Sequence, residues 1–171
     1  MSIIGWADRK RKEFEEKNNR LERLKLYHFT SNKNLESIYK IGLLGWETLE
    51  NKFNFKANKD YFPCSNSLSR RLDSEKNKKN YIRLCKSTEH YMIRNPRHND
   101  LVLLEIDTKI LKILICEFTS ENATKTGVVF SKDINVFLDS EDPHAEVLVW
   151  NKIPSKFILS KIHLKQENYN G

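Results

Sequence analysis

Glu146 is the residue whose position in the sequence most suggests chemistry. It stands at the head of the apolar run Val147–Trp150, directly after Ala145. A carboxylate that leads into a core strand is costly unless it is paired or used, and perturbed carboxylates are common at functional sites. An ordinary strand-end glutamate in a salt bridge would give the same pattern, so both interpretations stay open.

His28 is a second candidate, because it lies two residues before the hydroxyl of Thr30 in an aromatic, alternating segment, Leu24–Thr30. Alternation of this kind predicts a strand. An imidazole at a strand end, beside a hydroxyl, can donate or accept hydrogen bonds to a ribose. The alternative is a core histidine whose hydrogen bonds are satisfied, which is the commoner case for this residue type.

Arg70 and Arg71 form the third candidate group, inside a long polar segment. The planar guanidinium fork matches the oxygens of a pyrophosphate, so paired arginines suit a ligand of that kind. A solvated basic loop is the competing interpretation.

Several common catalytic motifs are absent from the sequence. There is no GxGxxG or P-loop pattern, and no HExxH or GxSxG pattern, which argues against a Rossmann dehydrogenase, an NTPase, a zinc protease and an α/β-hydrolase. The three cysteines are Cys64, Cys85 and Cys116, and they form no CxxC pair. We therefore expect isolated thiols in a reducing cytoplasm and no metal site.

Length and composition favour one compact domain over residues 1–171. Hydrophobic residues make up 39% of the chain and charged residues 31%, and the net charge is +7 from 30 basic and 23 acidic residues. Such an excess fits attraction to polyphosphate, although it can also serve solubility alone. No apolar run approaches the roughly 20 residues that span a bilayer, and no secretory signal opens the chain, so we expect a cytoplasmic protein that does not enter a membrane.

The first 80 residues predict two helices and a strand. The charged residues 6–25 indicate an N-terminal helical segment at about residues 2–23, packed through the stripe of Phe14, Leu21 and Leu24. After the strand Leu24–Thr30, the spacing of Leu35, Ile38 and Ile41 predicts a helix that Gly42 ends. Residues 43–80 are polar and lack periodicity, which is typical of a functional or mobile segment.

Strands dominate the rest of the chain. We expect strands at Tyr81–Cys85, Leu101–Ile106, Lys112–Phe118, Val128–Phe130, Ala145–Trp150 and Phe157–Leu164, a helix at Ser87–Arg94 and a polar loop at Thr119–Gly127. Long crossover helices do not separate these strands. The pattern predicts an α+β fold with mixed or antiparallel strands and peripheral helices.

Taken together and in order, these pieces resemble the DarT family of DNA ADP-ribosyltransferases, the toxins of DarT–DarG toxin–antitoxin systems. The resemblance rests on Tyr27-His28-Phe29-Thr30, Asn34-Leu35, Gly42-Leu43-Leu44, Arg70-Arg71, the loop Phe118–Ala123, Ala145-Glu146-Val147-Leu148-Val149, Pro154 and Ile158. It spans about residues 24–164. The chain departs from the family around residues 83–92, where relatives carry prolines.

The resemblance implies an ADP-ribosyltransferase-like core and an activity. NAD would be the substrate, with no metal, and the product an ADP-ribosylated base in single-stranded DNA. Glu146 would be the catalytic carboxylate, opposite the positive charge that develops on the ribose, and Arg71 a second catalytic residue. The residues that would bind NAD are His28, Thr30, Asn34 and Arg70.

The resemblance also implies partners. It suggests single-stranded DNA along a basic path, a macrodomain-type antitoxin, and a monomeric toxin or anti-phage effector. The path would be lined by Lys76, Lys78, Lys79, Arg83, Lys86, Arg94 and Arg97. Two alternatives stay open: a transferase of the same fold that acts on RNA or protein, and a nucleic-acid-binding module without catalysis.

Overall fold

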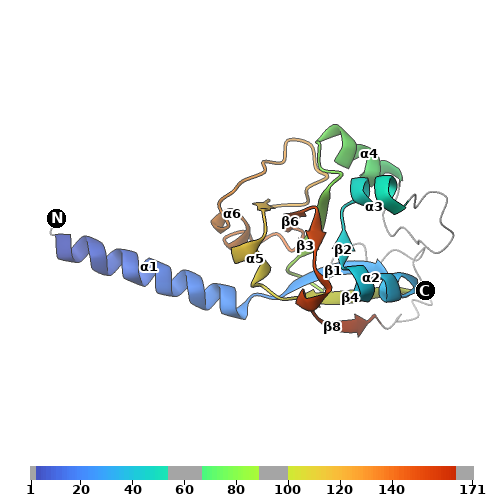
Figure 1. Ribbon diagram of the computed structural model, residues 1–171. Coiled ribbons are helices and arrows are strands. Elements are labelled where there is room, and N and C mark those ends of the chain that lie inside the picture. Colours follow the sequence, from blue (N-terminus) through green and yellow to red (C-terminus); the bar gives the residue numbers. More distant parts are fainter. Residues whose placement is uncertain (1–2, 54–66, 89–99, 165–171) are drawn as a thin grey trace, which may run out of the picture.

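A six-stranded sheet with the strand order β5-β6-β3-β1-β4-β8 forms the centre of the protein (Figure 1). The computed structural model describes residues 3–53, 67–88 and 100–164. All neighbouring strands of this sheet run antiparallel. The strands are β1 (Leu26–Ser31), β3 (Tyr81–Cys85), β4 (Leu101–Ile106), β5 (Cys116–Phe118), β6 (Glu146–Trp150) and β8 (Ile158–His163).

Apart from the long helix α1, the helices are short and lie around the sheet, and a second sheet pairs β2 (Leu43–Leu44) with β7 (Lys152–Ile153). The predicted α+β class, with an antiparallel sheet and peripheral helices, is therefore confirmed. The helices are α1 (Ile3–Arg23), α2 (Leu35–Ile41), α3 (Trp46–Phe53), α4 (Ser67–Glu75), α5 (Ile110–Ile113) and α6 (Asn135–Leu138), with short 3-10 turns η1 (Asn32–Asn34) and η3 (Ser155–Phe157).

The sheet positions β1 and β6 on either side of β3, two strands away from each other. Their sequences explain their central place, because Val147, Leu148 and Val149 are fully buried and Leu26 is fully buried as well. Apolar residues on both faces of a strand are typical of a strand covered on both sides. The two strands that carry His28 and Glu146 are thus separated by a single strand.

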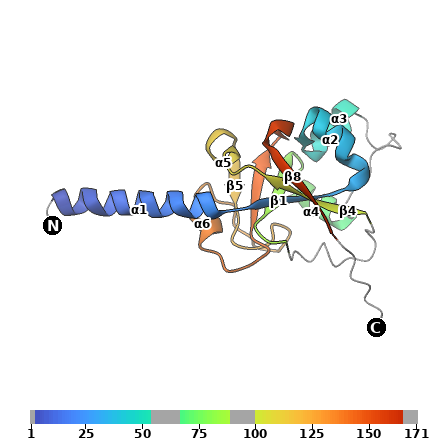
Figure 2. The ribbon, with the colours of Figure 1, turned by 90° about the horizontal axis from the view of Figure 1, so that it is seen from below.

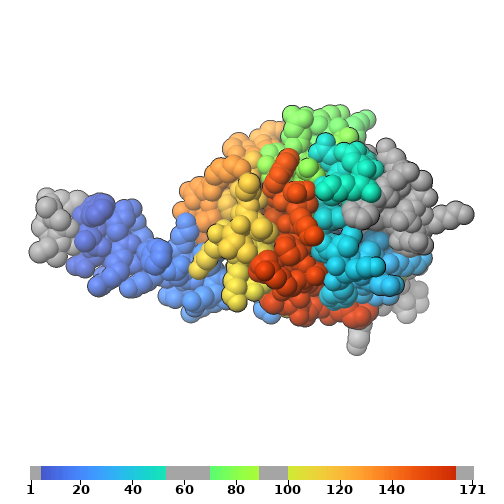
Figure 3. Space-filling view, in the orientation of Figure 1, coloured from blue at the N-terminus to red at the C-terminus, as the bar shows by residue number. Residues whose placement is uncertain are grey.

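Helix α1 extends away from the body of the protein in both ribbon views and in the space-filling view (Figure 2, Figure 3). The predicted N-terminal helix is present, but its packing differs from the expectation. Phe14 is 66% exposed, and of the predicted stripe only Leu24, just beyond the helix, packs against the main core. The exposed charges pair along the helix instead, as in Lys10–Glu13 and Arg11–Glu15.

Gly42 ends α2 as predicted, and its position also explains why glycine is needed there. Its φ of +91° lies in the region that side chains disfavour. A Cβ at Gly42 would lie 2.4 Å from the carbonyl oxygen of Ile153, so the turn packs tightly against β7.

Three of the predicted elements are wrong. The sequence predicts no helix or strand in residues 43–80, yet the described parts of this segment contain β2, α3 and α4. Residues 112–118 divide between the end of α5 and the strand β5. Val128–Phe130 is not a strand; the neighbouring Ser131 instead forms an isolated bridge with Phe118. Most of the helix predicted at Ser87–Arg94 lies outside the described residues.

Among the described residues, no helix combines the length and the apolar character needed to cross a membrane.

Candidate active site

Glu146 is the first residue of β6 and is almost completely buried, with 5% of its surface exposed. Its Oε2 accepts a hydrogen bond of 2.9 Å from the backbone N–H of Ala123 and one of 3.1 Å from Nη1 of Arg83. Both bonds end on Oε2, and Oε1 accepts no hydrogen bond from the described residues. Burial raises the pKa of Glu146, while Arg83 and the Ala123 amide oppose that rise.

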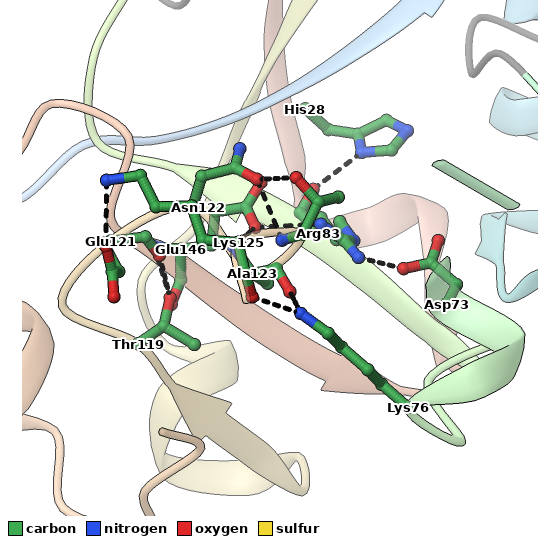
Figure 4. Close-up of polar contacts among 11 residues, drawn as sticks. His28, Asp73, Lys76, Arg83, Thr119, Glu121, Asn122, Ala123, Lys125 and Glu146 are labelled. Carbon is green, nitrogen blue, oxygen red and sulfur yellow. Dashed lines mark hydrogen bonds and ion pairs between the residues drawn. The ribbon is translucent and has the colours of Figure 1, made fainter. Parts of the chain in front are cut away.

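Arg83 lies between two buried carboxylates (Figure 4). Its Nη1 contacts Glu146, and its Nη2 donates to Oδ1 of Asp73. Asp73 is 5% exposed, and burial raises its pKa against the effect of Arg83. The register of β3 and β6 explains the contact with Glu146. Cys85 lies opposite Glu146, and Arg83 lies opposite Leu148. Side chains two residues apart on a strand share a face of the sheet, so Arg83 and Glu146 lie on the same face.

A loop between β5 and the start of β6 closes around Glu146. The backbone N–H of Glu146 donates to Oγ1 of Thr119 at 3.1 Å, and the Thr119 amide donates to the carbonyl of Glu146 at 3.0 Å. Lys76 holds the far side of the loop, because its ammonium donates to the carbonyls of Ala123 at 2.8 Å and Lys125 at 2.5 Å. The amide that binds Glu146 is therefore fixed from both sides.

His28 contacts the backbone of Arg83, although its side chain leaves β1 on the opposite face of the sheet from Glu146, since Tyr27 lies opposite Cys85 and Cys85 lies opposite Glu146. Its Nδ1 lies 3.0 Å from the carbonyl oxygen of Arg83 (Figure 4). A carbonyl only accepts, so Nδ1 carries the proton and donates. Burial lowers the pKa of His28, which favours the neutral ring, and Nε2 is then an acceptor for a ligand hydroxyl.

Thr30 and Asn34 are brought together next to His28 in the chain. Nδ2 of Asn34 donates to Oγ1 of Thr30 at 3.2 Å, and the two residues are 5% and 4% exposed respectively. This bond ties the end of β1 to the turn η1 that starts α2, so it fixes the direction in which β1 leaves the sheet.

Arg70 and Arg71 diverge, because neighbouring residues on a helix do not share a face. The guanidinium of Arg70 lies over the ring of Trp46, 5.4 Å from its centroid. Arg71 has a side chain that is 68% exposed, and its Nε lies 3.4 Å from Oε1 of Glu75. Asp73 is three residues after Arg70 and thus on its side of α4.

Several lysines and arginines that were predicted to line a basic path turn inward instead. Lys78 binds Glu117, with its ammonium 4.6 Å from the ring centroid of Tyr81. Lys86 donates to the carbonyls of Phe137 and Ser140. Lys76 and Arg83 are used within the site, as described above. Arg94 and Arg97 lie outside the described residues.

The sequence did not point to Asp73 or Thr119 as site residues, and it indicated Lys76 and Arg83 only as parts of the DNA path. One signal was available for Arg83: in Tyr81–Cys85 it alternates with Ile82 and Leu84, both buried, so it occupies the second face of a central strand. A charge in that place needs a partner of opposite sign. Among the described residues, no group of three or more His, Cys, Asp and Glu side chains is arranged to hold a metal ion.

Comparison with known proteins finds similarity in structure and not in sequence. No family model matches the chain, and no curated protein matches it. Two structures of DarT from Thermus sp. 2.9 are similar. The one in complex with ADP-ribosylated ssDNA has a TM-score of 0.65 at 14% identity over 85% of this chain and 83% of that chain. The one in complex with NAD+ has a TM-score of 0.60 at 15% identity over 85% and 84%.

Thermosipho africanus DarTG in complex with ADP-ribose is also similar, with a TM-score of 0.58 at 17% identity. The match covers 81% of this chain but only 43% of that one. At sequence identities this low, the similarity is one of backbone fold alone. The chain has the fold of the DarT ADP-ribosyltransferases.

Proposed function

We propose that this protein is an NAD-dependent mono-ADP-ribosyltransferase that modifies a base in single-stranded DNA. The observation that carries the proposal is Glu146: within a DarT fold, it is a buried carboxylate that Arg83 and Ala123 fix through Oε2, while Oε1 accepts no hydrogen bond from the described residues. The similar DarT structures hold NAD+ in one case and ADP-ribosylated ssDNA in another, which supports both substrates.

The reaction breaks the bond between nicotinamide and C1′ of its ribose. Nicotinamide leaves with the bonding electrons, and the ribose passes through an oxocarbenium-like state. A fixed negative charge near C1′ lowers the energy of that state more than the energy of bound NAD. Glu146 supplies the charge, and its Oε1 accepts a hydrogen bond from the ribose 2′-hydroxyl. A nitrogen of the DNA base then bonds to C1′ and releases its proton.

The other groups bind and orient NAD. His28, neutral and with Nε2 as acceptor, receives a hydroxyl of NAD, while Thr30 and Asn34 support the strand end that presents the ring. Arg70, on the same side of α4 as Asp73, binds the pyrophosphate, as the fork geometry of guanidinium favours. Arg71, on another side of the helix, reaches the phosphates only by exchanging its exposed pairing with Glu75.

The proposal extends to the partners of the protein. Single-stranded DNA is the acceptor because its bases are reachable without unpairing. A macrodomain-type antitoxin would be a second partner and would reverse the modification. The name of the similar Thermosipho africanus protein, DarTG, joins the names of a toxin and its antitoxin. We further propose a monomeric toxin that acts in the cytoplasm.

Labelled NAD distinguishes this proposal from its alternatives. Purified protein is incubated with NAD labelled in the adenosine part, together with single-stranded DNA, RNA or a mixture of proteins. The proposal predicts label on single-stranded DNA. Label on RNA or protein alone would replace the acceptor, and intact NAD in every reaction would refute the transferase.

A further inference from the structure

Two buried carboxylates share a single arginine beside the proposed reaction centre. Asp73 comes from α4, Glu146 from β6, and Arg83 from β3 between them. The side chains of Asp73 and Glu146 are each 6% exposed, and that of Arg83 is 20% exposed. Water therefore screens these three charges poorly, and each one acts strongly on the others.

The arrangement has a consequence for the charge of Glu146. Two carboxylates in one buried place oppose each other's ionisation, whereas the guanidinium favours the ionised form of both. Arg83 and Asp73 thus act on Glu146 with opposite sign. Among the described residues, the other polar or titratable groups near the cluster include Cys85 from β3, Lys76 just after α4, and Thr119, Glu121 and the Ala123 amide from the loop before β6.

We propose that Arg83 is a positioning residue that keeps the Glu146 carboxylate ionised and fixed in direction, and that Asp73 limits this effect by drawing on the same guanidinium. The inference rests on the proposed function, because an ionised Glu146 matters for transfer only if it faces an oxocarbenium. The chain's own geometry supports it: Nη1 and Nη2 of Arg83 each serve one carboxylate.

A role in stability alone would also explain a buried ion pair, so the test needs a measurement that does not depend on stability. The chemical shift of the carboxyl carbon of Glu146 is such a measurement, because it reports the ionisation of that carboxyl group. In protein labelled with 13C-glutamate, the Glu146 signal is assigned by its absence in Glu146→Gln, and its chemical shift is followed against pH. This measurement needs neither NAD nor DNA.

Three variants and a control are titrated in this way. Arg83→Gln should raise the midpoint of the Glu146 titration by about 1 to 3 pH units. Arg83→Lys retains the charge without the fork, and should give a midpoint between those of wild type and Arg83→Gln. Asp73→Asn removes the competing charge and should lower the midpoint. Arg20→Gln breaks an arginine pair with Asp139 away from the site and should leave the midpoint unchanged.

The opposite signs make the inference refutable even if Arg83→Gln fails to fold. A midpoint that rises or stays constant in Asp73→Asn would overturn it, as would an Arg83→Lys midpoint equal to or below that of wild type. The acid limb of the pH profile of ADP-ribosyl transfer should shift in the same order as the midpoints. If the midpoints move as expected but no variant and no wild type consumes NAD, the inference about Arg83 holds and the proposed function fails.

Discussion

The side chains at the centre of this protein are charged groups that a core normally excludes. Glu146 and Asp73 keep their place because Arg83 and a backbone amide satisfy them, and the desolvation cost of such a cluster is seldom repaid in stability alone. Clusters of this kind are concentrated where a protein does chemistry. The buried charges and the fold therefore both favour a place for chemistry around Glu146.

His28 allows a prediction about stability and pH. Its pKa is below the ordinary value of 6.5 because burial disfavours the charged ring, so the unfolded chain binds more protons as the pH falls. The contribution of His28 to stability is complete above about pH 6.5 and is lost on acidification below it. We expect His28→Asn, whose amide can still donate to the Arg83 carbonyl, to lose less stability than wild type between pH 7.5 and pH 5.

Urea unfolding at the two pH values measures this difference. The buried carboxylates, whose raised pKa values act in the reverse direction, are present in both proteins and cancel in the comparison. An equal or greater loss of stability in His28→Asn would show that His28 is not held neutral by burial.

At the scale of single residues, the sequence led to Glu146, His28 and Thr30 because each belongs to a short local pattern. It did not lead to the pairing of Arg83 with Asp73, which are ten positions apart but belong to a strand and a helix. That contact depends on how α4 lies against β3. The identities of the two residues say nothing about that packing.

At the scale of elements, α4 and the loop before β6 act together on the site. Asp73 and Lys76 are three residues apart in this part of the chain, so both lie on the side of α4 or its C-terminal turn that faces β3 and the loop. One binds Arg83, and the other binds two carbonyls of the loop. The helix therefore couples the position of the loop amide to that of the guanidinium.

Replacing Lys76 tests this coupling. Lys76→Met keeps the length of the side chain but removes two charge-assisted hydrogen bonds, and should cost about 1 to 3 kcal/mol of unfolding free energy. It should also accelerate hydrogen exchange at the Ala123 amide. Lys125→Met is the matched control, because Lys125 makes exposed ion pairs with Glu121 and Asp142, which water screens. Equal effects of the two variants would contradict the role of Lys76 in holding the loop.

The elements themselves were predictable where the apolar pattern was strong. Leu101–Ile106 and Glu146–Trp150 are strands because continuous apolar runs bury both faces. Helix α4 was missed because its sequence, Ser67–Glu75, is polar on most positions and owes its place to Asp73 and Arg70, which make tertiary contacts. The spacing of apolar residues along a segment does not reveal tertiary contacts of this kind.

At the scale of the whole molecule, the net charge is +7, but not every basic side chain is available to a partner. Four of them bind groups of the protein itself: Lys76, Lys78, Arg83 and Lys86. If the proposed function is correct, the remaining basic side chains supply the attraction to nucleic acid. We expect retention on single-stranded DNA at low salt, weakening about tenfold or more between 50 and 200 mM salt as counterion release predicts. Filter binding or fluorescence anisotropy with an oligonucleotide measures it. Affinity that does not respond to salt, or no binding at low salt, would argue for another acceptor.

The substitution Glu146→Gln tests the central claim most directly. It preserves the shape of the side chain and removes the charge that faces the developing oxocarbenium, which typically costs about 100- to 1,000-fold in rate. Glu105→Gln is the matched control, because Glu105 is a strand residue paired with Lys25 at 3.3 Å, outside the site. Transfer of labelled ADP-ribose to single-stranded DNA is measured for both, alongside thermal melting and NAD binding. We predict that folded Glu146→Gln binds NAD but nearly loses transfer while Glu105→Gln retains it; full transfer by folded Glu146→Gln would contradict the account.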